Sequence, residues 1–296
     1  MNISRADSHP GIVEKTFDAG GVRLSYAEGP ETGPPLVLLH GLGRRWQVFM
    51  PLIPSLSLRW QIFAPDFRGH GKSARVPKGY RGLEYSADTL KFLDECVPPR
   101  PAIFGHSMGG MVTMRIASQH PTLARAIMLG DNAIRVKDLR SPMFEDLFTG
   151  LRDLAARGGS VDEIARGIAE IYLRVPNYPR PIRIGDLPGN DSAYLQWWAR
   201  CVSQADPDTY AMTLDGSAKE GWDGEGYLRQ ILCPTLLLQA SPQFGALMSD
   251  EDVALALRLL KHPVHVRFDN LGHGLYMQQP EPVLRAITNF LDSLEE

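Results

Sequence analysis

The sequence predicts an α/β fold, in which a mostly parallel sheet is flanked by helices. Three observations carry this prediction. Short apolar runs alternate with helical patterns over residues 1–130. The later runs are continuously apolar, as expected of parallel strands that are buried on both faces. In the middle of the chain the strand signals stop, and they return only toward the C-terminal end, so an insertion is predicted to split one α/β core.

The predicted strands and helices follow one another along the chain. Apolar runs bounded by turn residues predict strands at Val22–Tyr26, Leu36–Leu39, Ile62–Ala64, Ala102–Phe104 and Ala126–Leu129. Helical spacing of apolar residues predicts helices at Trp46–Leu56, Leu83–Cys96 and Met108–Gln119. After the insertion, strands are predicted at Thr235–Gln239 and His265–Phe268, and helices at Asp250–Leu260 and Pro280–Leu294.

Residues 135–230 are predicted to form a helical lid, inserted between two parts of the core, residues 1–134 and 231–296. Helical patches occur there at Phe144–Ala156, Val161–Leu173 and Tyr194–Ser203, and segments rich in proline and glycine join them. Ligands of open α/β folds bind at the carboxyl ends of the strands. A pocket is therefore expected between this insertion and the core.

The composition excludes several classes of function. The formal net charge of −3 gives no electrostatic basis for binding nucleic acid or an anionic membrane surface. No apolar run reaches the ~18 residues of a membrane-spanning helix, and the start MNISRADSHPG lacks the apolar region of a secretory signal. The three cysteines are far apart, so neither a disulfide framework nor a metal site is expected. We expect a cytoplasmic protein with a small-molecule substrate, and the oligomeric state stays open.

A serine in a glycine-flanked turn is the strongest chemical signal. The segment GHSMGG, residues 105–110, directly follows a predicted strand and precedes a predicted helix. In the pattern Gly-x-Ser-x-Gly, small residues permit a sharp turn that exposes the serine Oγ at a helix N-terminus. Ser107 is therefore the candidate nucleophile, and the N–H of Met108 is a candidate oxyanion donor. The alternative is an ordinary tight turn.

A second glycine-rich loop, HGLG at residues 40–43, follows the predicted strand Leu36–Leu39. The backbone N–H of Leu42 is the candidate for the second oxyanion donor beside that of Met108. Losing one such donor typically lowers the rate by about 100- to 1000-fold. The alternative is a plain glycine-rich turn.

A histidine late in the chain supplies the candidate general base. A serine hydroxyl is a poor nucleophile until a base takes its proton, and the pKa of histidine suits that task. Of the eight histidines, only His273 lies late in the chain in a glycine-flanked loop after a strand, within DNLGHG at residues 269–274. His40 and His106 lie inside the motifs above and are expected to have positioning roles.

Four motifs in this order and spacing, HGLG, DFRGHGKS, GHSMGG and the late GHG, resemble the α/β-hydrolase superfamily. The resemblance covers nearly the whole chain and points to the lid-bearing branch of esterases, lactonases and carbon–carbon-bond hydrolases. It implies an eight-stranded, mostly parallel sheet with an inserted helical cap. It also implies a Ser–His–acid triad that needs no metal and no organic cofactor.

The triad acid is where the sequence departs from the family. Most relatives carry it in the turn after the strand that corresponds to Thr235–Gln239, where this chain has Ser241. A serine cannot supply the charge that stabilises the imidazolium. Some members take the acid from the end of the strand after the nucleophile helix, and Asp131 matches that place; the alternative is that Asp131 caps a turn. The segment SDED, residues 249–252, is interpreted as a helix start.

The insertion predicts an apolar, aromatic-lined cavity. Trp197 and Trp198 are the candidate substrate contacts, although aromatic residues at helical spacing more often pack in a core. We expect hydrolysis of a carboxylic ester or lactone of a small to medium, mostly neutral hydrophobic substrate. Two alternatives stay open. One is cleavage of a carbon–carbon bond in a ketone or β-diketone by the same residues, and the other is a catalytically weak ligand receptor, which the loss of the acid at Ser241 favours.

Overall fold

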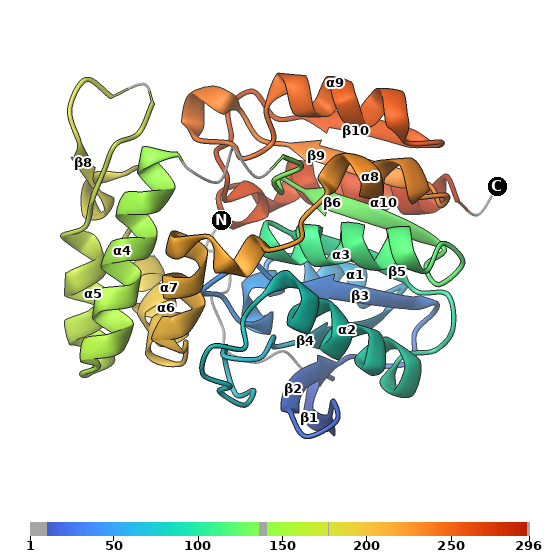
Figure 1. The fold of residues 1–296 in the computed structure, drawn as a ribbon, viewed down its shortest axis with the longest axis horizontal. Helices are drawn as coiled ribbons and strands as arrows, with labels where there is room; N and C mark the ends of the chain where they lie inside the picture. Colours follow the sequence, from blue (N-terminus) through green and yellow to red (C-terminus); the bar gives the residue numbers. More distant parts are fainter. Residues whose placement is uncertain (1–10, 136–140, 177, 295–296) are drawn as a thin grey trace.

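The predicted α/β class is confirmed by the computed structural model, which describes residues 11–135, 141–176 and 178–294 (Figure 1). Eight strands form one sheet in the order β1-β2-β4-β3-β5-β6-β9-β10. The β1–β2 and β2–β4 pairs are antiparallel, and the other five pairs are parallel. The strands span Val13–Asp18 (β1), Arg23–Glu28 (β2), Pro35–Leu39 (β3), Gln61–Pro65 (β4), Ala102–His106 (β5), Ala126–Gly130 (β6), Thr235–Gln239 (β9) and Pro263–Arg267 (β10).

Helices cover both faces of this sheet, and each face has its own apolar core (Figure 1). One face carries α2 (Gly82–Cys96), α3 (Met108–Gln119), α8 (Gly224–Gln230) and α9 (Asp250–Leu259). The other carries the 3₁₀ helix η1 (Trp46–Phe49), α1 (Ile53–Leu56) and α10 (Pro280–Asp292). Every residue of β4, β5, β6 and β9 is buried, which explains their continuously apolar sequences.

Four helices between β6 and β9 form a separate layer beside the sheet (Figure 1). They are α4 (Pro142–Arg157), α5 (Val161–Ala169), α6 (Ser192–Ser203) and α7 (Pro207–Asp215), and α4 packs on α7 while α5 packs on α6. Helix α8 falls within the predicted insertion but packs on α3 and α9 instead. The layer that stands apart from the sheet therefore ends before α8, earlier in the chain than residue 230.

Two of the predicted helices are shorter than expected. The predicted helix Trp46–Leu56 is divided into η1 and α1, because prolines at positions 51 and 54 lack the N–H that a continuous helix needs. The predicted helix Val161–Leu173 ends as α5 at Ala169. Beyond it, the two-residue strand β7 (Tyr172–Leu173) pairs with β8 (Ile182–Arg183).

The edge strand β1 is absent from the sequence prediction. All but one of its side chains are exposed and the remaining one is only partly buried, so its residues carry little apolar signal. Short 3₁₀ helices complete the chain at Ile184–Asp186 (η3), Ser217–Lys219 (η4), Pro242–Phe244 (η5) and Leu275–Met277 (η6).

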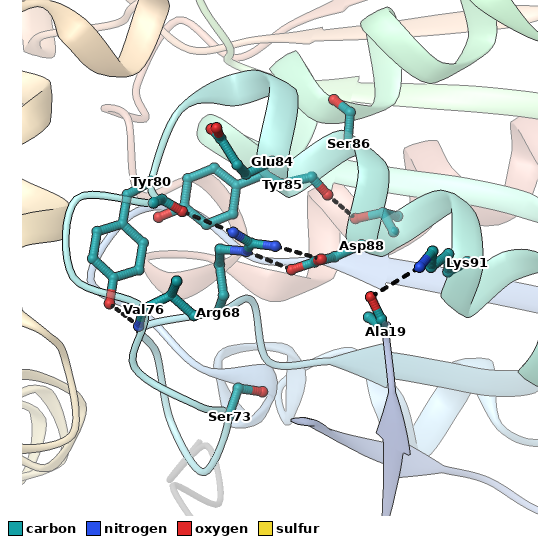
Figure 2. A network of polar contacts seen from close by, with 12 residues as sticks. Ala19, Arg68, Ser73, Val76, Tyr80, Glu84, Tyr85, Ser86, Asp88 and Lys91 are labelled. Carbon is teal, nitrogen blue, oxygen red and sulfur yellow. Dashed lines mark hydrogen bonds and ion pairs between the residues drawn. The ribbon is translucent and has the colours of Figure 1, made fainter. Parts of the chain in front are cut away.

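A buried ion pair fixes the loop after β4 to helix α2, as Figure 2 shows for Arg68 and Asp88. The Arg68 guanidinium donates through Nε and Nη2 to the two carboxylate oxygens of Asp88, at 2.6 Å each. The loop also reaches the insertion, since the Tyr80 hydroxyl donates to Asp206, the N-cap residue of α7, at 2.7 Å. These contacts tie the loop after β4 to α2 and to the insertion.

No helix in the described ranges combines the length and the apolar character needed to cross a membrane. The three cysteines, Cys96, Cys201 and Cys233, are all free. Residues 1–10, on which the expectation about a secretory signal rests, lie outside the described residues.

Candidate active site

The carboxyl ends of three neighbouring parallel strands bring the predicted site residues together. β5 lies between β3 and β6, and His106 at the end of β5 is opposite Gly130 at the end of β6. Ser107 follows β5, Asp131 follows β6, and the loop of residues 40–43 follows β3. The Ser107 N–H donates to the carbonyl oxygen of Gly130 at 2.9 Å, which ties the two strand ends to each other.

Ser107 occupies the sharp turn that the motif predicts. Its φ of 55° lies in the left-handed region that residues other than glycine rarely adopt. The turn ends β5 and begins α3 at Met108. Helix α3 then lies so close to β3 that a Cβ at Gly109 would overlap the carbonyl oxygen of Leu39. The glycine is therefore required for packing, and the turn leaves the Ser107 side chain on the wall of a cavity.

His273 and Asp131 form a chain of hydrogen bonds that leads to Ser107. Nε2 of His273 lies 3.1 Å from the Ser107 Oγ. Nδ1 of His273 donates to Oδ2 of Asp131 at 2.7 Å. The Asp131 side chain is fully buried, whereas 21% of the His273 side chain is exposed. This pairing sets the imidazole so that Nε2 is free to accept the serine proton.

Backbone N–H groups from a distant segment hold the Asp131 carboxylate. Oδ1 accepts from the N–H groups of Ala240 and Met248, both at 3.3 Å, and Oδ2 accepts from that of Leu247 at 2.9 Å. Asp131 itself has a φ of 42°. Such donors stabilise a buried carboxylate in its charged form. The loop between β9 and α9 thus provides the backbone donors to Asp131.

Ser241, at the position where an acid was expected, and Ser249 both make hydrogen bonds that stabilise the loop between β9 and α9. Ser241 is buried, and its backbone N–H donates to the carbonyl oxygen of Leu271 at 2.7 Å. Ser249 caps α9, where its hydroxyl accepts from the N–H of Asp252 at 3.1 Å. The predicted helix start at residues 249–252 is thereby confirmed.

The loop of residues 40–43 lies directly beside the serine. A Cβ on Gly41 would stand 3.1 Å from the Ser107 Cβ. Within the described residues, the N–H groups of Leu42 and Met108 donate to no other backbone or side-chain acceptor. Unpaired N–H groups beside the nucleophile are what an oxyanion hole requires, so Leu42 and Met108 remain the candidates for this role.

Two buried histidines hold this loop in place. Nε2 of His70 accepts from the Gly43 N–H at 3.0 Å, and Nε2 of His40 accepts from the Phe67 N–H at 3.1 Å. Burial lowers the pKa of His70 to about 4 and that of His40 well below its usual range. Both rings are therefore neutral near pH 7, as acceptors of N–H groups must be.

His106 holds the backbone of His273 in place, a contact that the sequence analysis did not specify. Its Nε2 donates to the carbonyl oxygen of His273 at 2.8 Å, and the two rings lie 4.9 Å apart between centroids. Burial and the neighbouring His273 lower the pKa of His106 to about 3. On the opposite side, Phe144 of α4 contacts His273 edge to face at 5.2 Å.

A largely apolar cavity opens beside Ser107. Its walls come from the loop of Leu42, from α2, from α3 and from the insertion, which contributes Phe144 and Phe148. One face of α3 lines it with residues at positions 108, 111, 112 and 115. That spacing of three and four was a signal in the sequence from which the cavity wall could have been predicted.

Trp197 and Trp198, expected to contact substrate, are not among the residues that line this cavity. Both are 6% exposed and belong to the apolar core that includes the insertion. Trp197 stacks on Tyr194 at 5.8 Å, and the Arg44 guanidinium carbon lies 4.2 Å from the ring centroid of Trp198. In this structure their rings pack in the core around α6 instead of lining this cavity, which is the more frequent use of aromatic residues at helical spacing.

Comparison with known proteins identifies the relatives of this chain. The model of the alpha/beta hydrolase family matches residues 36–286. The chain is 25% identical over 293 residues to 2-(acetamidomethylene)succinate hydrolase of Mesorhizobium japonicum, covering 95% of this chain and 96% of that enzyme.

Solved structures share the same fold. The crystal structure of E-2-(acetamidomethylene)succinate hydrolase matches with a TM-score of 0.68 at 25% identity, covering 95% of this chain and 99% of that one. The enol-lactonase from Burkholderia xenovorans matches with a TM-score of 0.70 at 17% identity, covering 94% and 100%. At 17% identity the second likeness concerns the fold alone.

Proposed function

Because this chain belongs to the alpha/beta hydrolase family, we propose that it hydrolyses a carboxylic ester or lactone through an acyl-enzyme formed on Ser107. The observation that carries this proposal is the hydrogen-bonded chain from Ser107 through His273 to Asp131, at 3.1 and 2.7 Å. Nucleophile, base and orienting acid are the three parts that such catalysis needs.

The first half of the reaction forms the acyl-enzyme. Nε2 of His273 accepts the Ser107 proton while Oγ attacks the carbonyl carbon of the substrate. The negative charge that develops on the carbonyl oxygen is stabilised by the N–H groups of Leu42 and Met108. As the tetrahedral intermediate collapses, His273 donates its proton to the departing alkoxide, and the alcohol is released. In a lactone this alcohol stays attached to the acyl group.

The second half reverses these roles with water. Nε2 of His273 accepts a proton from a water molecule, whose oxygen attacks the acyl carbon. The same two N–H groups stabilise the second oxyanion. His273 then returns the proton to Ser107 Oγ, and the carboxylic acid leaves. Throughout, Asp131 accepts the Nδ1–H of His273 and stabilises the positive charge that forms on the imidazole.

Two further observations support hydrolysis. The relative in Mesorhizobium japonicum, which is aligned over 95% of this chain, is itself a hydrolase. The receptor alternative was favoured by the serine at position 241, but the Asp131 carboxylate lies at hydrogen-bonding distance from His273. An acid in this place supports turnover over ligand binding alone.

Hydrolysis of a short-chain p-nitrophenyl ester by the wild type, beside Ser107→Ala, tests the proposal. The wild type should release p-nitrophenol and show the mass of an acylated protein after brief mixing. Ser107→Ala should lose both signals and keep its melting temperature, since it removes only one partly exposed hydroxyl. Turnover that persists in Ser107→Ala would contradict a role of this serine as nucleophile.

A further inference from the structure

The cavity beside Ser107 is lined by both apolar and charged side chains. Ser107 and Met108 stand where α3 begins, and the apolar side chains of Met111 and Val112 follow along the helix as part of the cavity wall. Arg115 is the next residue of α3 in this wall, and Lys219 and Glu220 are the other charged residues that line the cavity. A ligand that follows this wall therefore passes from the reacting centre across an apolar stretch to a charged group.

Arg115 is a cation in the cavity wall, and among the residues that the structure describes it has no carboxylate partner. It is half-buried, and its Nε is shielded from solvent and has no hydrogen-bond partner. Its guanidinium carbon lies 5.8 Å from the ring centroid of Tyr227 on α8. In the described part of the chain no acidic side chain forms an ion pair with Arg115.

Glu220, the acidic residue that lines the cavity, is paired with another side chain. Glu220 lies 3.5 Å from the guanidinium of Arg81, and 71% of its side chain is exposed. The Nε of the Arg115 guanidinium is shielded from solvent and has no partner among the described residues, and its desolvation cost would be offset by an anion from a ligand. The part of the cavity beside Arg115 thus favours a negatively charged group.

Helix geometry sets the length of the ligand. Arg115 stands eight positions after Ser107 on α3, or about 12 Å along the helix axis at 1.5 Å per residue. Side chains of a helix tilt toward its N-terminus, so the guanidinium lies somewhat nearer to Ser107 than its Cα does. An extended chain gains roughly 1.2 Å per bond, so about seven to ten bonds join the two groups.

We propose that the acyl group of the natural substrate ends in a carboxylate, which Arg115 binds, with an apolar chain between that carboxylate and the carbonyl that Ser107 attacks. This inference rests on the proposed hydrolase function and names the substrate class of the same site. The proposed substrate is still largely hydrophobic, as expected from the sequence, but it carries a negative charge where a mostly neutral molecule was expected.

Kinetics with matched ester pairs test the proposal. The substrates are p-nitrophenyl hemiesters of straight-chain dicarboxylic acids, from butanedioic to dodecanedioic acid, each beside the neutral alkanoate ester of equal length. The readout is the carboxylate preference, defined as the ratio of the two kcat/KM values. In the wild type it should be highest at intermediate length, since the shortest hemiesters cannot reach Arg115.

Three variants give this readout its controls. Arg115→Met should lower the peak preference by about 10- to 100-fold, the usual size of one charge-assisted hydrogen bond. Arg115→Lys should retain part of it, because the charge remains. Arg285→Met removes an exposed arginine of α10 that does not line the cavity, and it should leave the preference unchanged. An equal preference in wild type and Arg115→Met would overturn the assignment.

A binding measurement separates this inference from the proposed function. Nonanedioic acid should raise the melting temperature of the Ser107→Ala protein more than nonanoic acid does, and adding Arg115→Met should remove the difference. Esters that are never hydrolysed would contradict the proposed function, while this shift would still support the carboxylate site. Hydrolysis without a preference for carboxylate at any length, or equal shifts with both acids, would overturn the carboxylate site alone.

Discussion

At the scale of single residues, two side chains of the candidate triad stand on backbone that is costly to form. Ser107 has a φ of 55° and Asp131 a φ of 42°. A residue other than glycine keeps such a conformation only where its surroundings compensate the strain. For Asp131 the compensation is visible, because its carboxylate accepts N–H groups of residues 240, 247 and 248. One side chain thus orients His273 and holds the distant loop between β9 and α9.

Asp131→Asn should therefore lower both the rate and the stability. An amide in place of the charged partner of a catalytic imidazole lowers kcat by about 10⁴-fold in serine hydrolases of known mechanism. The amide also presents a donor where the carboxylate accepts backbone N–H groups, which should cost about 1–3 kcal/mol of unfolding free energy. Ester kinetics and urea denaturation measure the two effects. Turnover within a few-fold of wild type would show that the acid lies elsewhere or is not used.

At the scale of elements, helix α3 connects the reacting centre with the substrate cavity. It begins at Met108, directly after Ser107, and the face that carries positions 108, 111, 112 and 115 lines the cavity. On the side that faces the sheet, α3 packs closely on β3, because Gly109 has no side chain to separate them. Any shift of the helix to relieve a larger residue at this contact would therefore also move Ser107, which stands at its start.

Gly109→Ala tests how tightly this helix is placed. The new Cβ would overlap the backbone carbonyl of Leu39, so the helix must shift, at a cost of about 1–3 kcal/mol. Activity should fall as well, because Ser107 stands at the start of the same helix. Gly82→Ala is the matched control: it lies in the first turn of α2, and its Cβ would meet its nearest neighbour at an ordinary 3.6 Å. Equal melting temperatures of the two variants would refute the tight contact.

At the scale of the whole molecule, the site depends on groups that are buried in one protonation state. Burial lowers the pKa of His70 to about 4, that of His106 to about 3, and that of His40 well below its usual range. The pKa of Asp66 shifts in the opposite direction, because burial raises the pKa of its carboxyl to about 6. Its carboxylate nevertheless accepts the N–H of Trp46 at 2.7 Å.

These shifts predict that the protein loses stability as the pH falls below about 6.5, the pKa of an unfolded histidine. Each histidine with a lowered folded-state pKa stabilises the fold fully above that pH and loses its contribution on the way down to its folded pKa, by about 1.4 kcal/mol per pH unit. The raised pKa of Asp66 has the opposite effect, because it stabilises the folded protein as the pH falls from about 6 to 4. This one group is outweighed by the three buried histidines. Urea denaturation at pH 7 and pH 5 checks this, and equal unfolding free energies would refute it.

Much of the fold and part of the site were predictable from the sequence. Buried strands such as β5 and β6 are continuous apolar runs, and Ser107 stands in a local motif that few other structures use. The edge strand β1 was not predictable in this way, since its side chains are mostly exposed. Trp197 and Trp198 could be placed on a helix, but sequence does not state which face of that helix meets a cavity.

Patterns along the chain explain what the sequence determined by itself. The α/β class follows from the alternation of short apolar runs with helical patterns, and the turn at Ser107 and the loop of residues 40–43 each depend on a few consecutive residues. Tertiary structure alone decided how distant segments meet. Asp131 reaches His273 because β6 lies beside β5 and because backbone N–H groups more than a hundred positions away hold its carboxylate. Likewise, Arg115 shares a cavity with Ser107 only because α2, α3 and the insertion pack around one space. Such contacts depend on strand order and packing, which no short stretch of sequence encodes.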